Sequence, residues 1–202
     1  MDLTSHGEIV LRQRKELAEL AGFETRNKFE ILAADGGQLG FAAEQGKGLG
    51  AVLARMFVGH WRTFEVHVFD AQRELRLIAL HPFRFFFQRL EVRTPDGRPL
   101  GALQRRFSVL TKRFDVEDAT GRVSMSVASP IWKPWTFPFR RDGREVATVV
   151  KRWSGALQEM FTDADNFRIG FTDPALTRDE RSLLLAAGIF IDLQFFEKKA
   201  ND

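Results

Sequence analysis

The chain of 202 residues contains no cysteine. This absence excludes disulfide bonds, cysteine nucleophiles, thiolate metal sites and S-acylation. It is compatible with a reducing compartment but does not require one.

Long apolar runs are also scarce. The stretch MDLTSHGEIVLRQRKELAEL, residues 1–20, has no continuous apolar region, so we expect no secretory signal. The longest apolar run is LLLAAGIFI, from Leu183 to Ile191, and Asp192 interrupts it. A membrane-spanning helix needs roughly 20 predominantly apolar residues. We therefore interpret this run as a buried helix, with single-pass membrane insertion as the alternative.

Patterns of covalent catalysis are missing as well. The histidines show no metal-ligand spacing. The sequence has no serine-centred elbow, no phosphate loop and no dinucleotide fingerprint. The stretch GKGLG, residues 46–50, lacks the rest of a phosphate-binding loop. We therefore expect a protein that is not an enzyme.

The composition is that of a globular protein with a core. Hydrophobic residues make up 44% and charged residues 28% of the chain. The net charge of +3 and the isoelectric point near 9.5 suit an acidic partner, such as a lipid headgroup or nucleic acid. No linker rich in proline or serine divides the chain, so we expect one domain.

Most of the chain alternates apolar and polar residues in the pattern of β-hairpins. In each unit an alternating strand leads to a turn, such as Asp96-Gly97 or Asp142-Gly143, and then to a returning strand. The units are residues 27–44, 62–80, 88–103, 112–129 and 137–150, with a further hairpin-like unit at 161–171. Their irregular spacing favours successive hairpins of a barrel or sandwich over a propeller.

Both ends of the chain are expected to be helical. Residues 1–22 have a discontinuous apolar face and predict an amphipathic helix that ends at Gly22 and packs on the domain. Residues 180–197 predict a second helix that is apolar on nearly every side. Such a helix lies in a membrane or is enclosed by protein. We expect residues 23–202 to form a β-rich (α+β) domain, a barrel wound around this helix.

Five blocks of the chain resemble the phospholipid scramblase family, within the tubby-like C-terminal domain superfamily. They occur in the order and at the spacing typical of the family. The blocks are ELAELAGFETRNKFEI (16–31), FAAE (41–44), TPDGRPLGAL (94–103), VVKRWSGALQEMFTDADNF (149–167) and AAGIFIDLQFFE (186–197). The resemblance implies a closed β-barrel of about 12 strands around a central hydrophobic C-terminal helix. It also implies calcium-stimulated movement of phospholipids between bilayer leaflets.

The chain departs from eukaryotic members of that family in two respects. They carry a proline-rich N-terminal extension, which we expect this chain to lack, and a palmitoylated cysteine cluster. Where relatives have cysteine-rich loops, this chain has HPFRFFFQRL (81–90) and SPIWKPWTFPF (129–139).

The resemblance places calcium ligands in the segment that contains Asp163, Asp165 and Asp173. Calcium takes six to eight oxygen ligands. A register like that of an EF-hand, counted from Asp163, puts Arg168 where the turn demands glycine and Pro174 where the bidentate carboxylate belongs. We therefore expect at best a weak calcium site.

An alternative interpretation of this segment is structural. Residues 163–166 would then form a hairpin turn, and Phe167, Ile169 and Phe171 would point into the barrel.

Aromatic and basic residues alternate in several segments that suit a membrane interface. The candidate lipid-binding residues are Phe85, Phe86, Phe87, Trp132, Lys133, Trp135, Arg140, Arg141, Lys151 and Arg152. For Lys151 and Arg152, the resemblance to tubby-like domains implies contact with phosphoinositide phosphates. Ordinary barrel strands or a dimer contact are the alternatives. Nucleic acid is not expected, because no recognised motif accompanies these segments.

Asp192 is a carboxylate within the apolar helix. An unpaired buried charge is costly, so we expect Asp192 to be neutral, hydrogen-bonded or paired with an arginine, near the exit of the helix from the barrel.

These observations predict a cytoplasmic protein that associates peripherally with membranes and anionic lipids. The leading hypothesis is phospholipid movement between leaflets, in which oligomers could take part. The alternatives are a soluble lipid- or phosphoinositide-binding module and a scaffold without transport activity.

Overall fold

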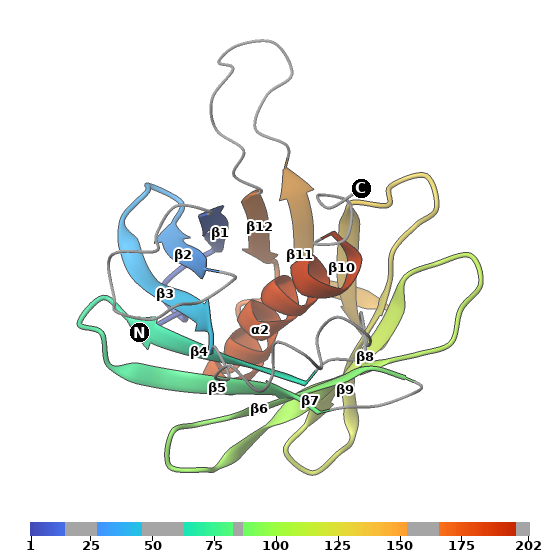
Figure 1. The fold of residues 1–202 in the computed structure, drawn as a ribbon. Coiled ribbons are helices and arrows are strands. Elements are labelled where there is room, and N and C mark those ends of the chain that lie inside the picture. The colour runs from blue at the N-terminus through green and yellow to red at the C-terminus, as the bar shows by residue number, and fades with distance from the viewer. Residues whose placement is uncertain (15–27, 46–62, 83–86, 153–165, 197–202) are drawn as a thin grey trace.

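The computed structural model describes residues 1–14, 28–45, 63–82, 87–152 and 166–196. In this part of the chain, twelve antiparallel strands close into a barrel around one helix, α2 (Arg178–Phe195) (Figure 1). The strands are β1 (Glu8–Arg14), β2 (Lys28–Ala33), β3 (Gln38–Glu44), β4 (Phe64–Asp70), β5 (Leu75–His81), β6 (Arg89–Arg93), β7 (Pro99–Arg105), β8 (Arg113–Asp118), β9 (Val123–Ala128), β10 (Thr136–Arg141), β11 (Arg144–Arg152) and β12 (Asn166–Phe171). The predicted tubby-like barrel around a central helix is confirmed.

Each strand pairs with its neighbours in the sequence, so the barrel is an up-and-down array. The five predicted hairpins are confirmed as β2–β3, β4–β5, β6–β7, β8–β9 and β10–β11. Their short turns all lie at one end of the barrel, which we call the turn end. The connections from β5 to β6, β7 to β8 and β9 to β10 lie at the opposite end, which we call the loop end. The turn end therefore carries the turns within the hairpins, and the loop end carries the connections between successive hairpins.

The N-terminal helix expected over residues 1–22 is wrong for Glu8–Arg14, which form β1. Ile9 and Leu11 are fully buried, two residues apart, as on a strand with one face toward the core. β1 pairs with β2 on one side and β12 on the other. These two ladders close the barrel, and a helix here would leave both neighbouring strands with open edges. The barrel thus begins at Glu8, while residues 15–22 lie outside the described segments.

β12 confirms part of the structural interpretation of the acidic segment. Phe167 and Ile169 are fully buried and Phe171 is half-buried against the core. The hairpin turn was expected over residues 163–166. This expectation is wrong for Asn166, which is the first residue of β12, and residues 163–165 lie outside the described segments.

α2 occupies the interior of the barrel. Its residues from Arg181 to Leu193 are all buried. Where the helix passes β1 and β12, a Cβ atom at Gly188 would lie 2.7 Å from Leu11 Cδ1 and 2.9 Å from Ile169 Cδ1. Glycine therefore lets the helix approach this side of the wall. Within the described segments, no helix is both long and apolar enough to cross a membrane.

The first turn of α2 is held at the turn end. Thr177 and Glu180 form a capping box, in which the Thr177 hydroxyl accepts from the Glu180 N–H. Arg98 donates to Asp179 at 2.8 Å, and this hydrogen bond lowers the pKa of Asp179. The buried Arg181 guanidinium donates to the Leu3 carbonyl at 2.9 Å. The N-terminal segment is thereby tied to the start of the helix.

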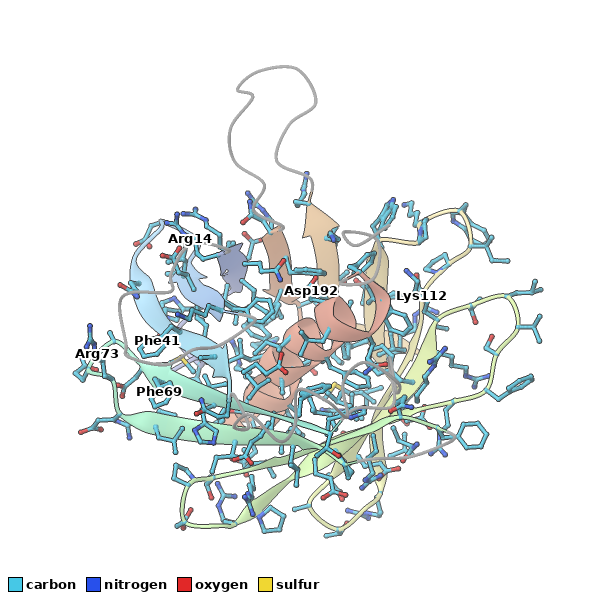
Figure 2. The ribbon with its side chains drawn as sticks, viewed as in Figure 1. Arg14, Phe41, Phe69, Arg73, Lys112 and Asp192 are labelled. Carbon is cyan, nitrogen blue, oxygen red and sulfur yellow. The ribbon has the colours of Figure 1, made fainter. Side chains whose placement is uncertain are left out.

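The last turn of α2 is held at the loop end by two lysines. Lys112 Nζ lies 4.4 Å and Lys151 Nζ 4.1 Å from the centre of the Phe196 ring. Lys112 Nζ also lies 5.2 Å from the centre of the Phe195 ring. Such cation–π contacts are attractive, and more so when they are desolvated. Figure 2 shows Lys112 beside the C-terminal end of the helix.

Asp192 lies one turn before that end, as expected. It is buried, and its carbonyl accepts the Phe196 N–H at 3.0 Å. Its protonation state stays a prediction.

Substituting leucine for Gly188 is expected to destabilise the protein, because the larger side chain has no space between the helix and the wall. The free energy of unfolding should fall by about 3 kcal/mol, as for other overpacked cores. Chemical denaturation measures this change. Gly7→Ala is the control, since a Cβ there meets no atom within 4 Å. Equal denaturation midpoints for the two variants would contradict the close approach of α2 to the wall.

Replacing Lys112 with methionine keeps the aliphatic part of the side chain but removes the charge. We expect the free energy of unfolding to fall by about 1–2 kcal/mol, from the lost cation–π contacts and hydrogen bond. The same change at the exposed Lys133 is the matched control and should be neutral within about 0.5 kcal/mol. If both variants unfold at the same denaturant concentration, Lys112 does not hold the helix end.

Candidate functional site

Large exposed apolar side chains gather at the loop end. Among the described residues, seven large hydrophobic side chains are exposed, and only Val123 of these lies at the turn end. Five belong to the connections β7–β8 and β9–β10 and are 57% to 82% exposed. These five, which we call the apolar rim, are Phe107, Val109, Leu110, Ile131 and Trp132. Phe87 is exposed in the β5–β6 connection at the same end.

The β7–β8 connection holds its apolar residues outward by its own hydrogen bonds. The Arg106 N–H donates to the Arg113 carbonyl at 2.9 Å and closes the loop at its base. The Thr111 N–H donates to Ser108 Oγ at 3.1 Å, and the two hydroxyls are 2.8 Å apart. Val109 and Leu110, between these partners, are left at the tip.

The β9–β10 connection consists of two consecutive turns. The Lys133 N–H donates to the Pro130 carbonyl, and the Thr136 N–H donates to the Lys133 carbonyl, both at 3.0 Å. Ile131 and Trp132 lie inside the first turn and are exposed. The turn therefore presents two large apolar side chains next to one lysine.

Lys112 joins the two connections into one unit. Its carbonyl accepts the Ser129 N–H at 3.0 Å, and its Nζ donates to the Pro134 carbonyl at 3.2 Å. Beside these contacts, Arg113 of β8 pairs with Ala128 of β9. Figure 1 shows both loops projecting on the side of the barrel where α2 ends. The apolar rim is thus one surface built from two loops.

The apolar rim is surrounded by cations. Residues 105–113 and 129–135 contain five basic residues and no carboxylate. The basic residues are Arg105, Arg106, Lys112, Arg113 and Lys133. Arg106 donates to Asp115 at 2.6 Å, so one of these charges is balanced by a neighbouring strand. This surface combines apolar side chains with an excess of positive charge.

The structure brings several of the predicted lipid-binding residues together. Trp132 and Lys133 are exposed neighbours in the β9–β10 connection, and Phe87 is exposed at the same end. Trp135 is half-buried, with its ring 5.2 Å from that of Phe196. Phe85 and Phe86 lie outside the described segments. Lipid contact stays a prediction for each of these candidate residues.

The other candidates are spread over the barrel. Arg141 lies at the turn end, where it is hydrogen-bonded to Glu180. Arg140 precedes it and is exposed on β10. Lys151 is buried against aromatic rings, while Arg152, the last residue of β11, is exposed. The structure therefore does not bring Arg141 near Trp132, and it encloses Lys151 in the wall.

Sequence reasoning missed Phe107, Val109, Leu110 and Ile131. The stretch RRFSVLT, residues 105–111, falls between two predicted hairpins, and no role was assigned to it from the sequence. The signal that could have found it is an apolar dipeptide between basic residues in a connection, since connections usually expose their residues.

Of the three predicted metal ligands, Asp173 alone belongs to the part of the chain that the structure describes. Asp173 follows β12 at the turn end, and its Oδ1 accepts the Ala175 N–H at 2.9 Å. Asp163 and Asp165, outside the described segments, precede the opposite end of β12. This strand has six residues and spans roughly 20 Å at about 3.3 Å per residue. An ion bound next to Asn166 would be out of reach of Asp173. The described residues contain no group of three or more histidine or acidic side chains that could hold a metal ion.

The chain is similar to known proteins over nearly its whole length. A family model described as Scramblase matches residues 2–198. Phospholipid scramblase 1 of Rattus norvegicus is 29% identical over 215 residues, which cover 99% of this chain and 63% of the rat protein. Phospholipid scramblase 2 of Bos taurus is 28% identical, with 96% of this chain and 70% of the bovine protein covered. The chain thus spans less than two thirds of the rat relative.

A solved structure supports the fold alone. An X-ray structure of a protein from Arabidopsis thaliana matches with a TM-score of 0.52 at 10% identity, covering 92% of this chain and 90% of that one. The family model, in contrast, includes all twelve strands and α2. This protein belongs to the scramblase family.

Proposed function

We propose that this protein binds phospholipid membranes peripherally, through the loop end of its barrel, and moves phospholipids between the two leaflets. The observation that carries the proposal is the combination of exposed apolar side chains and excess positive charge in a member of this family. Tryptophan and lysine together suit the depth of lipid headgroups, where rings and cations are both stabilised. The activity is lipid handling, without covalent chemistry.

Lipid movement through the interior of the barrel would require α2 to leave. Its seven large apolar residues between Leu183 and Leu193 are buried. Exposing them to water would cost on the order of 10–20 kcal/mol, at about 1.5–3 kcal/mol for each. The whole free energy of unfolding of a typical domain is about 5–15 kcal/mol. We therefore place the action of the protein at the bilayer surface, where the loop end perturbs lipid packing with the barrel intact.

A second candidate function is a lipid-binding module that moves no lipid. The enclosed helix favours it, because an intact barrel offers no internal path for headgroups.

Vesicles that carry a fluorescent phospholipid in both leaflets can separate the two functions. A membrane-impermeant reductant quenches only the outer leaflet, unless the protein returns lipid from the inner leaflet during the assay. The proposal predicts quenching beyond the outer-leaflet fraction in vesicles that contain the purified protein. Binding to vesicles without additional quenching would support the binding module.

We further propose that calcium accelerates this movement through Asp163 and Asp165, without Asp173. Carboxylate oxygens are the ligands that calcium prefers. The double variant Asp163→Asn/Asp165→Asn should lose the difference between calcium and chelator in the vesicle assay. Asp173→Asn is the matched control and should keep it, because Asp173 lies beyond the far end of β12. If Asp173→Asn alone lost the calcium response, the assignment of the site to Asp163 and Asp165 would be wrong. If the wild type moved lipid at equal rates with calcium and with chelator, the calcium proposal would be overturned.

A further inference from the structure

The two loops of the apolar rim differ from ordinary surface in how their apolar residues are arranged. Single exposed hydrophobic side chains are normal in soluble proteins. Here five large ones project from two loops that are hydrogen-bonded to each other. Their exposure is imposed by the loops, since Ser108 and Thr111 bond to each other and leave Val109 and Leu110 at the tip.

We propose that the apolar rim is a two-pronged membrane wedge, with the β7–β8 and β9–β10 loops inserted among the acyl chains of an anionic bilayer. This inference rests on the proposed binding of phospholipid and specifies the surface that makes the contact. The barrel then docks end-on, with the loop end in the bilayer surface and the turn end away from it.

The polar groups of the two loops suit shallow insertion. Backbone groups without hydrogen bonds are costly in hydrocarbon. In the β7–β8 loop the hydroxyls and the Thr111 N–H bond within the loop. In the β9–β10 loop Pro130 and Pro134 have no N–H to satisfy, and the Lys133 N–H is bonded. The tips can therefore leave water at a smaller cost than open loops of the same length.

The basic residues around the rim favour an anionic bilayer as its partner. Arg105, Arg113 and Lys133 are exposed cations at the base of the two loops, and neither loop carries a carboxylate. Anionic lipid headgroups attract such basic residues when the tips insert. A second copy of this protein, related by a two-fold axis, would instead bring the same cations against one another. Charge thus favours a bilayer over self-association as the occupant of the rim.

Lys112 connects the inserted loops to the C-terminal end of α2. It bonds to both sides of the β9–β10 loop and lies over the Phe195 and Phe196 rings. Insertion of the wedge therefore places the C-terminal end of α2 next to the bilayer, while its capped start remains on the distant side.

The test is co-sedimentation of the full chain with phosphatidylcholine vesicles, with and without phosphatidylserine. The variant Val109→Ser/Leu110→Ser removes the tip of one prong without touching the core. Its partition onto phosphatidylserine-containing vesicles should fall on the order of tenfold to a hundredfold, because shallow insertion buries only part of each of the two large apolar side chains. Val123→Ser is the matched control, because Val123 is an exposed valine at the turn end, and it should bind as the wild type does.

A second measurement reports insertion directly. Phospholipids with brominated acyl chains quench only tryptophans that reach the hydrocarbon, and Trp132 is the tryptophan of the rim and is exposed. The wild type should show a quenched component that Trp132→Phe lacks.

The outcomes separate the wedge from the proposed function. Loss of binding in the tip variant alone, together with quenching of Trp132, supports the wedge. Equal binding of the tip variant and the wild type overturns the wedge and leaves phospholipid binding in place. Failure of the wild type to bind any vesicle overturns both. A wild-type dimer that the tip variant converts to a monomer, with vesicle binding unchanged, would make the rim a self-association surface and overturn the wedge.

Discussion

The pairing of β1 with both β2 and β12 is the constraint on which the rest of the structure depends. It joins the first and last strands and turns an open array into a closed wall. Only a closed wall can bury α2 on every side, and only an enclosed environment suits a helix that is apolar all round. Leu11 of β1 and Ile169 of β12, both fully buried, make the part of the wall that meets Gly188. Closure and helix burial therefore rely on the same side chains.

The closed barrel has two ends with different chemistry. At the turn end, basic side chains are matched with carboxylates: Arg98 with Asp179, Arg141 with Glu180, and Arg76 with Asp70. Burial alone would raise the pKa of Asp70, but the hydrogen bonds from Arg76 and from the Glu74 N–H outweigh it and the pKa is lowered. At the loop end, the two rim loops combine cations and apolar side chains without a carboxylate. The turn end thus holds three pairs of opposite charge, whereas the loops of the rim carry basic side chains without a carboxylate of their own.

Most of the fold was predictable from the sequence because the hairpins and the enclosed helix each have a clear local sequence pattern. Two-residue alternation and turns such as Asp142-Gly143 define the hairpins without reference to the rest of the chain. Residues 183–191 are apolar on every side of a helix, and this local pattern indicates a helix that is enclosed. β1 was mistaken for a helix because its charged outer face, with Arg12 and Arg14, and two buried residues fit either period over such a short stretch. Its identity depends on two strands distant in the sequence.

The candidate site was only partly predictable. Trp132 and Lys133 drew attention by their residue types, and the structure places them on an exposed loop. Val109 and Leu110 are ordinary core residues by type, so residue type alone does not reveal their exposure, which the Ser108–Thr111 contacts beneath them impose. The separation of Arg141 from Trp132 likewise follows from strand direction, because Trp132 lies in the connection before β10 and Arg141 is the last residue of that strand.

Closure between β1 and β12 also sets the order of events during synthesis. The ion pair between Glu8 and Arg168 joins residues that are 160 positions apart in the chain. A ribosome therefore releases β1 long before its second partner exists, and the hairpins made in between must wait with their apolar faces uncovered. α2 is made after β12, so the residues that fill the interior arrive after all twelve strands of the wall. The nascent chain has to remain free of aggregation until α2 emerges, which is a demand on the cell's chaperones as much as on the sequence.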